Sequence, residues 1–290
     1  MSELSFAGRT VLITGAGRGL GRAHAFAFAA RGAAVVVNDL DESADEVAAD
    51  IRGLDGVAEA LVGDVAVPAV AEAAVAQAIN RFGQLDVVVA NAGIDAITPL
   101  REVTPQLLTE YFRVHVLGTW GVCSAVWPHF VDRHYGRIVT TTSAAGYFGL
   151  RRALPYATAK GALHAMTQTL AAEGARNGIT ANAIAPFAAS RLARNRTRSA
   201  PQLYDAIERF APPSAVSPVV LWLAHETTTV SGAAFEVGAG GVSRIEVAVG
   251  ETASVEADPA SWSHGELTVA PVEAADRPLT RWLGRQAAEM

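Results

Sequence analysis

The strongest constraint on the fold lies in residues 10–21, where an apolar run leads directly into a cluster of glycines. Residues 10–14 read Thr-Val-Leu-Ile-Thr, which is typical of a buried parallel strand, and the alanine-rich segment over 22–31 predicts a helix. A strand, a glycine turn and a helix N-terminus form an anion site, because the backbone can approach a pyrophosphate and the free amides face it. The sequence therefore predicts dinucleotide contacts from Gly15, Arg18, Gly19 and Leu20.

A carboxylate follows the next apolar run. Residues 34–38 predict a second strand, and Asp39 comes directly after it, about 20 residues beyond Gly19. A carboxylate at this place accepts hydrogen bonds from the adenosine ribose hydroxyls and repels a 2′-phosphate, which favours NAD. Arg18 indicates the opposite, since a cation in the turn can bind that phosphate, so NADP is the alternative. We give Asp39 more weight because Leu40 offers no cation.

Strand and helix patterns alternate along most of the chain. Helices are expected over 43–54, 68–82 and 105–133, the last interrupted near Gly118 and Gly121, and strands over 58–63, 85–90 and 136–142. This alternation predicts a single α/β domain: a doubly wound Rossmann-type parallel sheet with helices on both faces. Asp64 and Asn91 follow two of the strands, at the edge where ligands bind. The structural alternative is that both side chains only bond their own backbone turns.

Tyr156 and Lys160 stand four residues apart in a segment expected to be helical, so their side chains share one face. A nearby fixed positive charge lowers the pKa of a phenol from about 10 toward neutrality, where it exchanges a proton with an alcohol or carbonyl oxygen. Lys160 is the single lysine of the chain, beside 22 arginines. An ordinary surface pair on a helix is the alternative. Ser143, at the end of the preceding strand, is placed to hold the reacting oxygen.

Composition narrows the classes of function and partner. A formal net charge of −6 argues against a nucleic-acid partner. The single Cys123 fits a reducing compartment and excludes a multi-cysteine metal site, and we expect no metal. No signal peptide or membrane-length apolar run is recognised, so we expect a cytoplasmic protein without a membrane partner. Eight acidic and three basic residues follow Arg244. We therefore expect a cofactor-binding domain over 1–245 and an acidic extension over 246–290 that packs on the body or on a neighbouring subunit.

Several motifs in order resemble the short-chain dehydrogenase/reductase family over about residues 8–237. They are Thr14-Gly15, Gly19, Gly21, Asn91-Ala92-Gly93, Ser143, Tyr156 and Lys160. The resemblance implies an NAD-dependent oxidoreductase that interconverts a secondary alcohol and a ketone, as a homodimer or homotetramer. It implies that Tyr156 is the acid/base, that Ser143 polarises the substrate oxygen, and that Lys160 lowers the tyrosine pKa and binds the nicotinamide ribose. Further cofactor contacts are then expected from Asp64, Val65, Asn91, Ala92, Gly93 and Pro186.

His115 occupies the position at which many members of the family carry an asparagine that orders a proton-relay water. An imidazole can also bridge a water. His115 belongs to a narrower likeness as well, because residues 35–40, 113–115, 220–226 and 235–240 resemble the (3R)-hydroxyacyl-CoA dehydrogenase part of the multifunctional β-oxidation enzymes. This implies a 3-hydroxyacyl-CoA substrate and a role in lipid metabolism. The alternatives are a dehydrogenase for a steroid, terpenoid or polyketide alcohol and a non-catalytic NAD-binding protein.

The segment over 187–213, after Pro186, corresponds to a mobile lid in the family and is expected to select the substrate. Arginines at positions 191, 194, 196 and 198 suit the phosphates of coenzyme A, although a solvated helical face is the favoured interpretation. Phe187 in this segment, and Tyr147 just after Ser143, are expected to line the substrate pocket. Tyr147, like its neighbour Phe148, would suit a core equally well.

Overall fold

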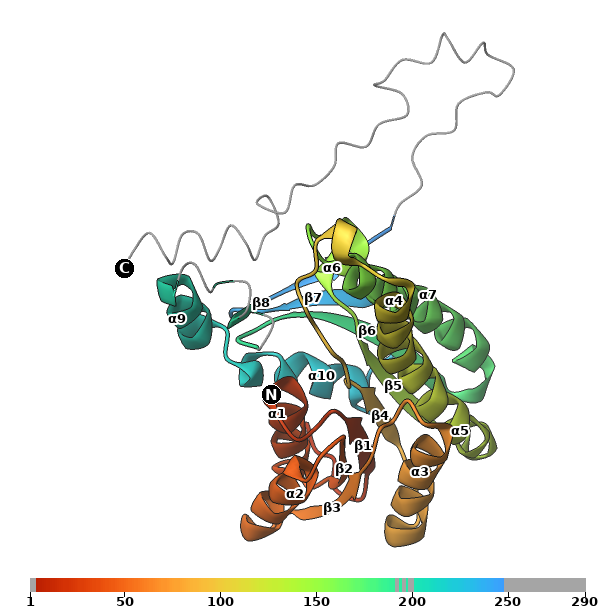
Figure 1. Ribbon diagram of the computed structural model, residues 1–290. Helices are drawn as coiled ribbons and strands as arrows, with labels where there is room; N and C mark the ends of the chain where they lie inside the picture. The colour runs from red at the N-terminus through yellow and green to blue at the C-terminus, as the bar shows by residue number, and fades with distance from the viewer. Residues whose placement is uncertain (1–3, 191–192, 195–196, 198–200, 248–290) are drawn as a thin grey trace, which may run out of the picture.

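A single sheet of eight strands organises the chain. The computed structural model describes residues 4–190, 193–194, 197 and 201–247, and its strands lie in the order β3-β2-β1-β4-β5-β6-β7-β8 (Figure 1). β1 to β7 pair in parallel, and β8 runs antiparallel to β7. The strands are β1 Thr10–Thr14, β2 Ala34–Asp39, β3 Val57–Val62, β4 Val87–Ala90, β5 Gly136–Thr141, β6 Ile179–Phe187, β7 Ala234–Gly238 and β8 Gly241–Ile245.

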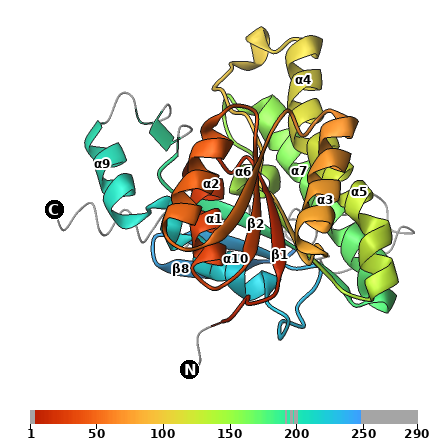
Figure 2. The same cartoon turned by 90° about the horizontal axis from the view of Figure 1, so that it is seen from below.

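Helices cover both faces of the sheet (Figures 1 and 2). α1 (Gly19–Ala29), α2 (Ser43–Gly53) and α10 (Ser217–Ala224) lie on one face, and α3 (Pro68–Phe82), α5 (Gly118–Arg133) and α7 (Leu154–Gly174) on the other. Successive side chains of a strand point to opposite faces, so Val11 packs with Phe28 in one core cluster while Leu12 packs with Phe130 in the other. The doubly wound Rossmann-type sheet is thereby confirmed.

The strand order reverses between β1 and β4, which lie side by side although two strands separate them in the sequence. In such sheets ligands bind in the crevice outside the carboxyl ends of the strands at this reversal. Shorter elements stand around that edge or link the helices. They are α4 Pro105–Tyr111, α6 Ala144–Phe148, α9 Pro201–Phe210 and the 3₁₀ turns Leu100–Glu102, Ala175–Asn177 and Pro213–Ala215.

The helical region over 105–133 is not broken at its glycines, contrary to expectation. The irregularity lies earlier, in a π-helical turn over Phe112–Leu117, and α5 runs through both Gly118 and Gly121. These glycines serve close packing. A Cβ on Gly118 would lie 3.3 Å from Val65 Cγ1, and one on Gly121 would lie 3.5 Å from Ala71 Cβ on α3. A close approach to Val65 therefore accounts for Gly118, whereas a Cβ on Gly121 would make only an ordinary contact with α3, and neither glycine breaks the helix.

β8 ends at Ile245, where the change in charge begins. Of the expected acidic extension over 246–290, residues 248–290 lie outside the described part of the chain, so its packing stays a prediction. Among the described residues, no helix is both long and apolar enough to span a membrane. The same residues contain no group of three or more His, Cys, Asp or Glu side chains arranged to hold a metal ion. Cys123 is buried, as expected for a core thiol.

Candidate active site

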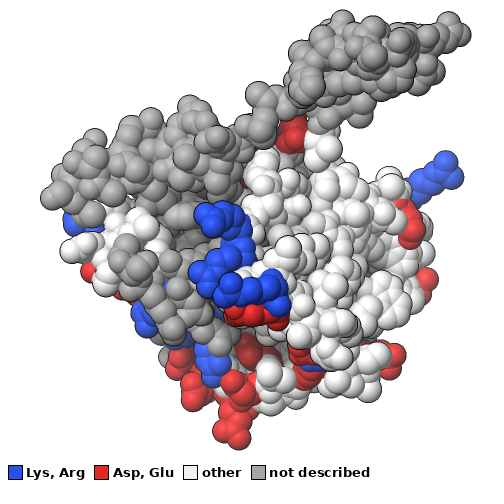
Figure 3. Space-filling model, turned by 45° about the horizontal axis from the view of Figure 1, so that its top comes forward, with Lys and Arg blue, Asp and Glu red and all other residues white. Residues whose placement is uncertain are grey.

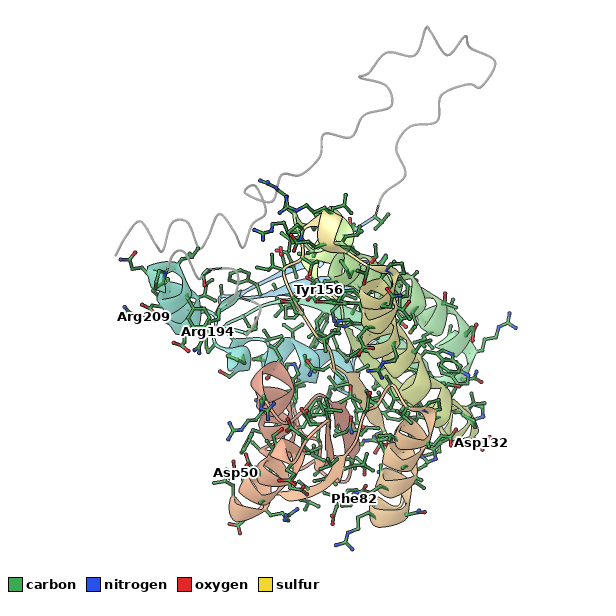
Figure 4. The ribbon with its side chains drawn as sticks, in the orientation of Figure 1. Asp50, Phe82, Asp132, Tyr156, Arg194 and Arg209 are labelled. Carbon is green, nitrogen blue, oxygen red and sulfur yellow. The ribbon has the colours of Figure 1, made fainter. Side chains whose placement is uncertain are left out.

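A cavity of about 410 Å³ lies where β4, β5 and β6 end. Its lining contains all four side chains expected to be catalytic: Ser143, Tyr156, Lys160 and His115. Four of the expected cofactor residues also line it, namely Leu20, Asn91, Gly93 and Pro186. Figure 4 shows Tyr156 at the upper end of the sheet, well away from Asp132 at the far end of α5. The fold thus gathers residues separated by up to 170 positions, Leu20 to Ser190, around one space.

The glycine turn between β1 and α1 is shaped for a close approach to the backbone. Gly15 has a φ of +62°, and a Cβ on it would lie 2.7 Å from Ala92 Cα. A Cβ on Gly21 would lie 2.2 Å from the Gly15 carbonyl oxygen. The first turn of α1 has no side-chain cap at its N-cap residue, Arg18, so its amides are left for a ligand. The turn therefore fits the pyrophosphate of a dinucleotide.

Two carboxylates stand beside this turn. Asp39 Oδ2 accepts a hydrogen bond from the Gly17 amide at 2.7 Å, so the residue at the end of β2 also fixes the turn. The Arg18 guanidinium donates to both carboxylate oxygens of Asp41, at 2.8 and 3.0 Å. Hydrogen bonds from Ser43, and then that of Arg18, lower the pKa of Asp41 to about 2. The cation that suggested a 2′-phosphate is therefore engaged by a neighbouring carboxylate.

Asn91 joins the end of β4 to the glycine turn. Its side-chain amide donates to the carbonyl oxygens of Thr14 and Gly15, both at 3.0 Å, and the Asn91 and Ala92 amides donate to Thr14 Oγ1. The Asn91 side chain thus bonds the glycine turn rather than its own backbone turn, and it borders the cavity, while its contact with a cofactor stays a prediction.

The Asp64 carboxylate is bound by a nearby backbone amide and by an arginine. Its carboxylate accepts from the Ala66 amide at 2.9 Å and from the Arg113 guanidinium at 2.6 Å. Arg113 also pairs with Glu110, and the hydrogen bonds that its guanidinium donates to Glu110 and Asp64 raise its pKa. The next residue, Val65, is buried in the core on the α3 side. Neither Asp64 nor Val65 lines the cavity, and their contacts with a cofactor stay predictions.

Tyr156 and Lys160 lie on one face of α7, as their spacing predicts. Pro155 occupies the first turn of this helix, where its missing amide leaves no bond unmade. The Lys160 ammonium donates to the Thr141 carbonyl oxygen at 2.5 Å and lies 5.7 Å from the centroid of the Tyr156 ring. Lys160 is only 3% exposed, and burial lowers its pKa to about 7 against the opposing charge of Asp95. The compact ammonium thus sits beneath the phenol rather than in solvent.

Ser143 lies two positions after the last residue of β5, Thr141, and is the N-cap of α6. Its Oγ accepts a hydrogen bond from the Ala145 amide at 3.2 Å. Because the oxygen acts as the acceptor in this bond, the hydroxyl proton remains to be donated to a ligand. The cap also fixes the side chain against the cavity that it shares with Tyr156.

His115 reaches the site from the π-helical turn. Single π-helical turns are frequent at functional sites, and this one brings the imidazole next to two tyrosine rings, Tyr111 at 5.8 Å and Tyr156 at 5.6 Å between centroids. Nε2 lies 2.8 Å from the Ile94 carbonyl oxygen and 3.3 Å from the Ile94 amide nitrogen, and we assign the proton to Nε2 because the shorter contact is to an oxygen that can only accept. Burial, and then the charge of Lys160, lower the His115 pKa to about 3. The ring is therefore neutral, and its buried Nδ1 is an acceptor with no hydrogen-bond partner among the described residues.

The two aromatic residues expected at the substrate lie outside the lining of the cavity. The Tyr147 hydroxyl bonds His164 Nδ1 at 3.1 Å, on α7, and approaches Thr142 Oγ1 at 3.5 Å. Phe187 packs with a small cluster that includes Ile207 of α9. Both side chains thus make local contacts, and for Tyr147 this is the alternative that its aromatic character allowed.

Of the four lid arginines, only Arg194 falls within the described residues. Its guanidinium stacks 4.8 Å from the Tyr204 ring centroid and lies 3.8 Å from Glu208 on α9. Figure 4 shows Arg194 beside α9, away from Tyr156. These exposed contacts support the interpretation of a solvated face for this residue. Arginines 191, 196 and 198 lie outside the described part of the chain.

Several lining residues were not singled out from the sequence: Ile94, Asp95, Thr141, Thr142, Ala188 and Ser190. Most are neighbours of motifs that were recognised, so proximity to a strand end was the available signal. Asp95 is different, because it brings a carboxylate into the cavity from the loop after Asn91-Ala92-Gly93. On the face drawn in Figure 3, the described residues form a small basic cluster near the middle, and acidic side chains lie mainly below it. Uncharged residues separate these groups over much of the face.

Comparisons with known proteins agree with this geometry. The family model described as short chain dehydrogenase matches residues 9–200. The peroxisomal multifunctional enzyme type 2 of Mus musculus is 41% identical over 254 residues, which cover 84% of this chain and 33% of that protein. A hydroxy(phenyl)methylsuccinyl-CoA dehydrogenase subunit of Thauera aromatica is 36% identical, over 61% of this chain and 72% of its own.

A solved structure extends the likeness to three dimensions. The crystal structure of a short chain dehydrogenase from Mycobacterium avium superposes with a TM-score of 0.78 at 33% identity, covering 88% of this chain and 92% of that one. The chain spans about a third of the length of the mouse relative. The likeness therefore concerns the dehydrogenase-like part of the larger protein.

Proposed function

The chain belongs to the short-chain dehydrogenase family, and on this premise we propose that it oxidises a secondary alcohol to a ketone, or reverses that step, with NAD and the residues of the cavity. Membership makes it an oxidoreductase of CH–OH groups that uses NAD or NADP. The observation that supports the proposed site most strongly is the shared cavity of Ser143, Tyr156, Lys160 and His115. Bound nicotinamide supplies the acceptor or donor of hydride.

The proposed roles follow from the position of each group. In alcohol oxidation, the carbinol carbon loses a hydride while Tyr156 takes the hydroxyl proton as general base. Ser143 donates its hydroxyl proton to the reacting oxygen and orients it. Lys160 stabilises the phenolate by its charge. Reduction uses the same groups with the proton transfer reversed. The His115 ring is neutral and lines the cavity, so its Nδ1, which lacks a partner among the described residues, can accept from a water that links Tyr156 to solvent.

We propose NAD rather than NADP. Asp39 at the end of β2 supports this choice, and so does the engagement of Arg18 by Asp41, because the carboxylates would face a 2′-phosphate while the nearest cation is already paired.

Replacing Asp39 by asparagine is expected to raise the ratio of kcat/KM for NADP to that for NAD by about tenfold, which is about 1.4 kcal/mol. Asparagine retains one oxygen that can accept from the Gly17 amide and gives up the acceptor for the Leu40 amide, so the contact with the glycine turn is kept while the repulsion is lost. The measurement is steady-state kinetics with both cofactors. Asp45→Asn, in the first turn of α2, is the matched control. An unaltered cofactor ratio in Asp39→Asn would mean that the residue does not read the ribose.

For the substrate, we propose a 3-hydroxyacyl-CoA thioester in lipid metabolism. Two similarities support this class of substrate: the one to the mouse multifunctional enzyme, and the one to the Thauera aromatica protein, whose name gives a CoA thioester as its substrate. The test is a panel of secondary alcohols assayed by the absorbance of reduced nicotinamide. It includes short and long (3R)-hydroxyacyl-CoA esters, hydroxysteroids and simple cyclic alcohols.

The expected outcome is the highest kcat/KM with a (3R)-hydroxyacyl-CoA ester. A preference for a steroid or cyclic alcohol would replace this substrate by the alternative one. Tight NAD binding without turnover of any substrate in the panel would favour a non-catalytic binding protein. We also propose that the chain forms a homodimer or homotetramer, which light scattering on the purified protein tests. We propose that it is cytoplasmic, which imaging of the tagged chain in its host cell tests.

A further inference from the structure

The Lys160 ammonium is buried, and burial disfavours a charged group. The side chain is 3% exposed, and the hydrogen bonds among the described residues give its ammonium one acceptor, the Thr141 carbonyl oxygen. An ammonium without compensation in such a site loses its proton, because burial destabilises the charged form. The proposed chemistry nevertheless needs the charge, since a neutral amine would not stabilise the Tyr156 phenolate. A negative charge near Lys160 would resolve this conflict.

Asp95 is the carboxylate that meets this need. It lies in the loop after β4, two residues beyond Gly93, and lines the same cavity as Lys160. Both of its carboxylate oxygens are buried from solvent. A buried carboxylate is itself unfavourable unless an opposite charge compensates it. The interaction between the two groups is attractive and favours the charged form of Lys160.

We propose that Asp95 is the counter-charge of Lys160: a positioning residue that keeps the ammonium protonated and thereby keeps Tyr156 able to ionise. Asp95 acts through Lys160 and does not itself exchange a proton with the substrate. This inference rests on the proposed role of the Tyr156–Lys160 pair. It adds a residue that no motif marks and that the fold supplies from a different strand end.

The other titratable groups around Lys160 leave Asp95 as the source of negative charge. In the described part of the cavity lining, the titratable side chains besides Lys160 are Asp95, His115 and Tyr156. His115, from the π-helical turn, is neutral, and Tyr156 lies on the same helix as Lys160. β5 contributes the Thr141 carbonyl dipole, and α6 packs the backbone of Gly146 against that of Lys160.

Loss of this charge has two consequences that can be measured. The Tyr156–Lys160 pair with one proton removed exists either as phenolate with ammonium or as phenol with amine, and only the first form is active as a base. Asp95 favours the charged form of Lys160 and so the first of these two forms. Removing it shifts the pair toward the inactive form and also makes each proton of the pair easier to lose, so both apparent pKa values of the coupled pair fall.

The single lysine permits a direct test on the whole chain. Labelling with lysine that carries ¹³C at the Cε methylene gives one resonance, that of Lys160, whose shift reports the protonation of the amine. For the unliganded protein the expected midpoint is near pH 7. In Asp95→Asn, which keeps the shape of the side chain, it is expected to fall by about one pH unit, as for two charges several ångströms apart in a partly desolvated site.

Two further variants complete the experiment. Asp95→Glu retains the charge and is expected to keep the midpoint within a few tenths of a pH unit of wild type. Asp132→Asn, on the exposed far end of α5, removes a carboxylate of the same kind at a distance and is expected to leave the midpoint unchanged. An unchanged midpoint in Asp95→Asn, or an equal fall in Asp132→Asn, would overturn the proposal.

The same variants are then assayed for alcohol oxidation against pH. Asp95→Asn is expected to lower the plateau kcat and to move the acid limb of kcat/KM to lower pH, whereas a purely structural role would alter KM or stability and leave the limb in place. The resonance does not depend on turnover. A normal fall of the midpoint in a protein without dehydrogenase activity would therefore reject the proposed function but not the charge pairing.

Discussion

Replacing Tyr156 by phenylalanine is expected to lower kcat by about 10²–10⁴-fold, the usual contribution of a general acid or base, while NAD affinity stays nearly unchanged. The substitution removes one oxygen from a ring that is packed against His115 and is otherwise buried. The shape of the cavity and the glycine turn remain, and so does the ability to bind the cofactor. The measurement is single-turnover kinetics beside a fluorescence titration with NAD.

Tyr204→Phe on α9 is the matched control, because it removes the same oxygen from a ring outside the cavity. It is expected to keep wild-type turnover. If Tyr156→Phe oxidised the best alcohol of the panel as fast as wild type, the phenol would not be the acid/base. A loss of NAD affinity equal to the loss of kcat would instead indicate that Tyr156 is needed for binding.

Replacing Lys160 by methionine is expected to lower kcat by an amount similar to that of Tyr156→Phe, about 10²–10⁴-fold, because the two residues act as one unit. Methionine fills the space of the aliphatic stem without bringing a charge. The double variant is expected to lose little more than either single one. Additive losses, multiplying to the product of the two, would show that the lysine and the tyrosine work independently.

The same substitution is expected to stabilise the unliganded protein at neutral pH. The folded-state pKa of Lys160, about 7, is depressed from the ordinary lysine value of 10.5, so the unfolded chain binds this proton more tightly. The stability of wild type therefore rises with pH between these two values, and the destabilising effect is full below about pH 7. The Tm of Lys160→Met should exceed that of wild type most at or below pH 7, and the difference should shrink toward pH 10. A constant difference across this range would contradict the depressed pKa.

The sheet and most of the site were open to prediction because their signals are local. Residues 10–21 carry the strand, the turn and the helix start within one short segment, and steric contacts at Gly15 and Gly21 explain why glycine stands there. The four-residue spacing of Tyr156 and Lys160 needs only a regular helix to bring them to one face. Ser143 needed only a strand that ends beside that helix.

The remainder depends on packing between elements that are distant in the sequence. Gly118 and Gly121 suggested a helix break, but the helix continues through them, and the tight contact with Val65 accounts for Gly118. The π-helical turn is one short turn between two α-helices, so no repeating pattern of apolar residues in the sequence marks it. Tyr147 turns to His164 instead of the cavity.

The position of Asp95 in the cavity could not be predicted from the sequence for the same reason. A carboxylate in a loop is common, and only the fold shows that it enters the cavity of Lys160. The ion pair between Arg18 and Asp41, likewise, joins the glycine turn to a residue just before α2, and the two are distant in the sequence. Positions along strands and helices were therefore predictable, whereas the charge arrangement around the catalytic pair required coordinates.

The most direct test of the proposed active site is a crystal structure of the chain with NAD bound. The expected result places the nicotinamide ring in the cavity with Tyr156 and Ser143 beside its reactive face, leaving about 3–3.5 Å for a substrate atom to approach each reacting group, and places the Lys160 ammonium at the nicotinamide ribose. A nicotinamide bound elsewhere, or Tyr156 and Lys160 turned away from it, would contradict the catalytic role of the pair.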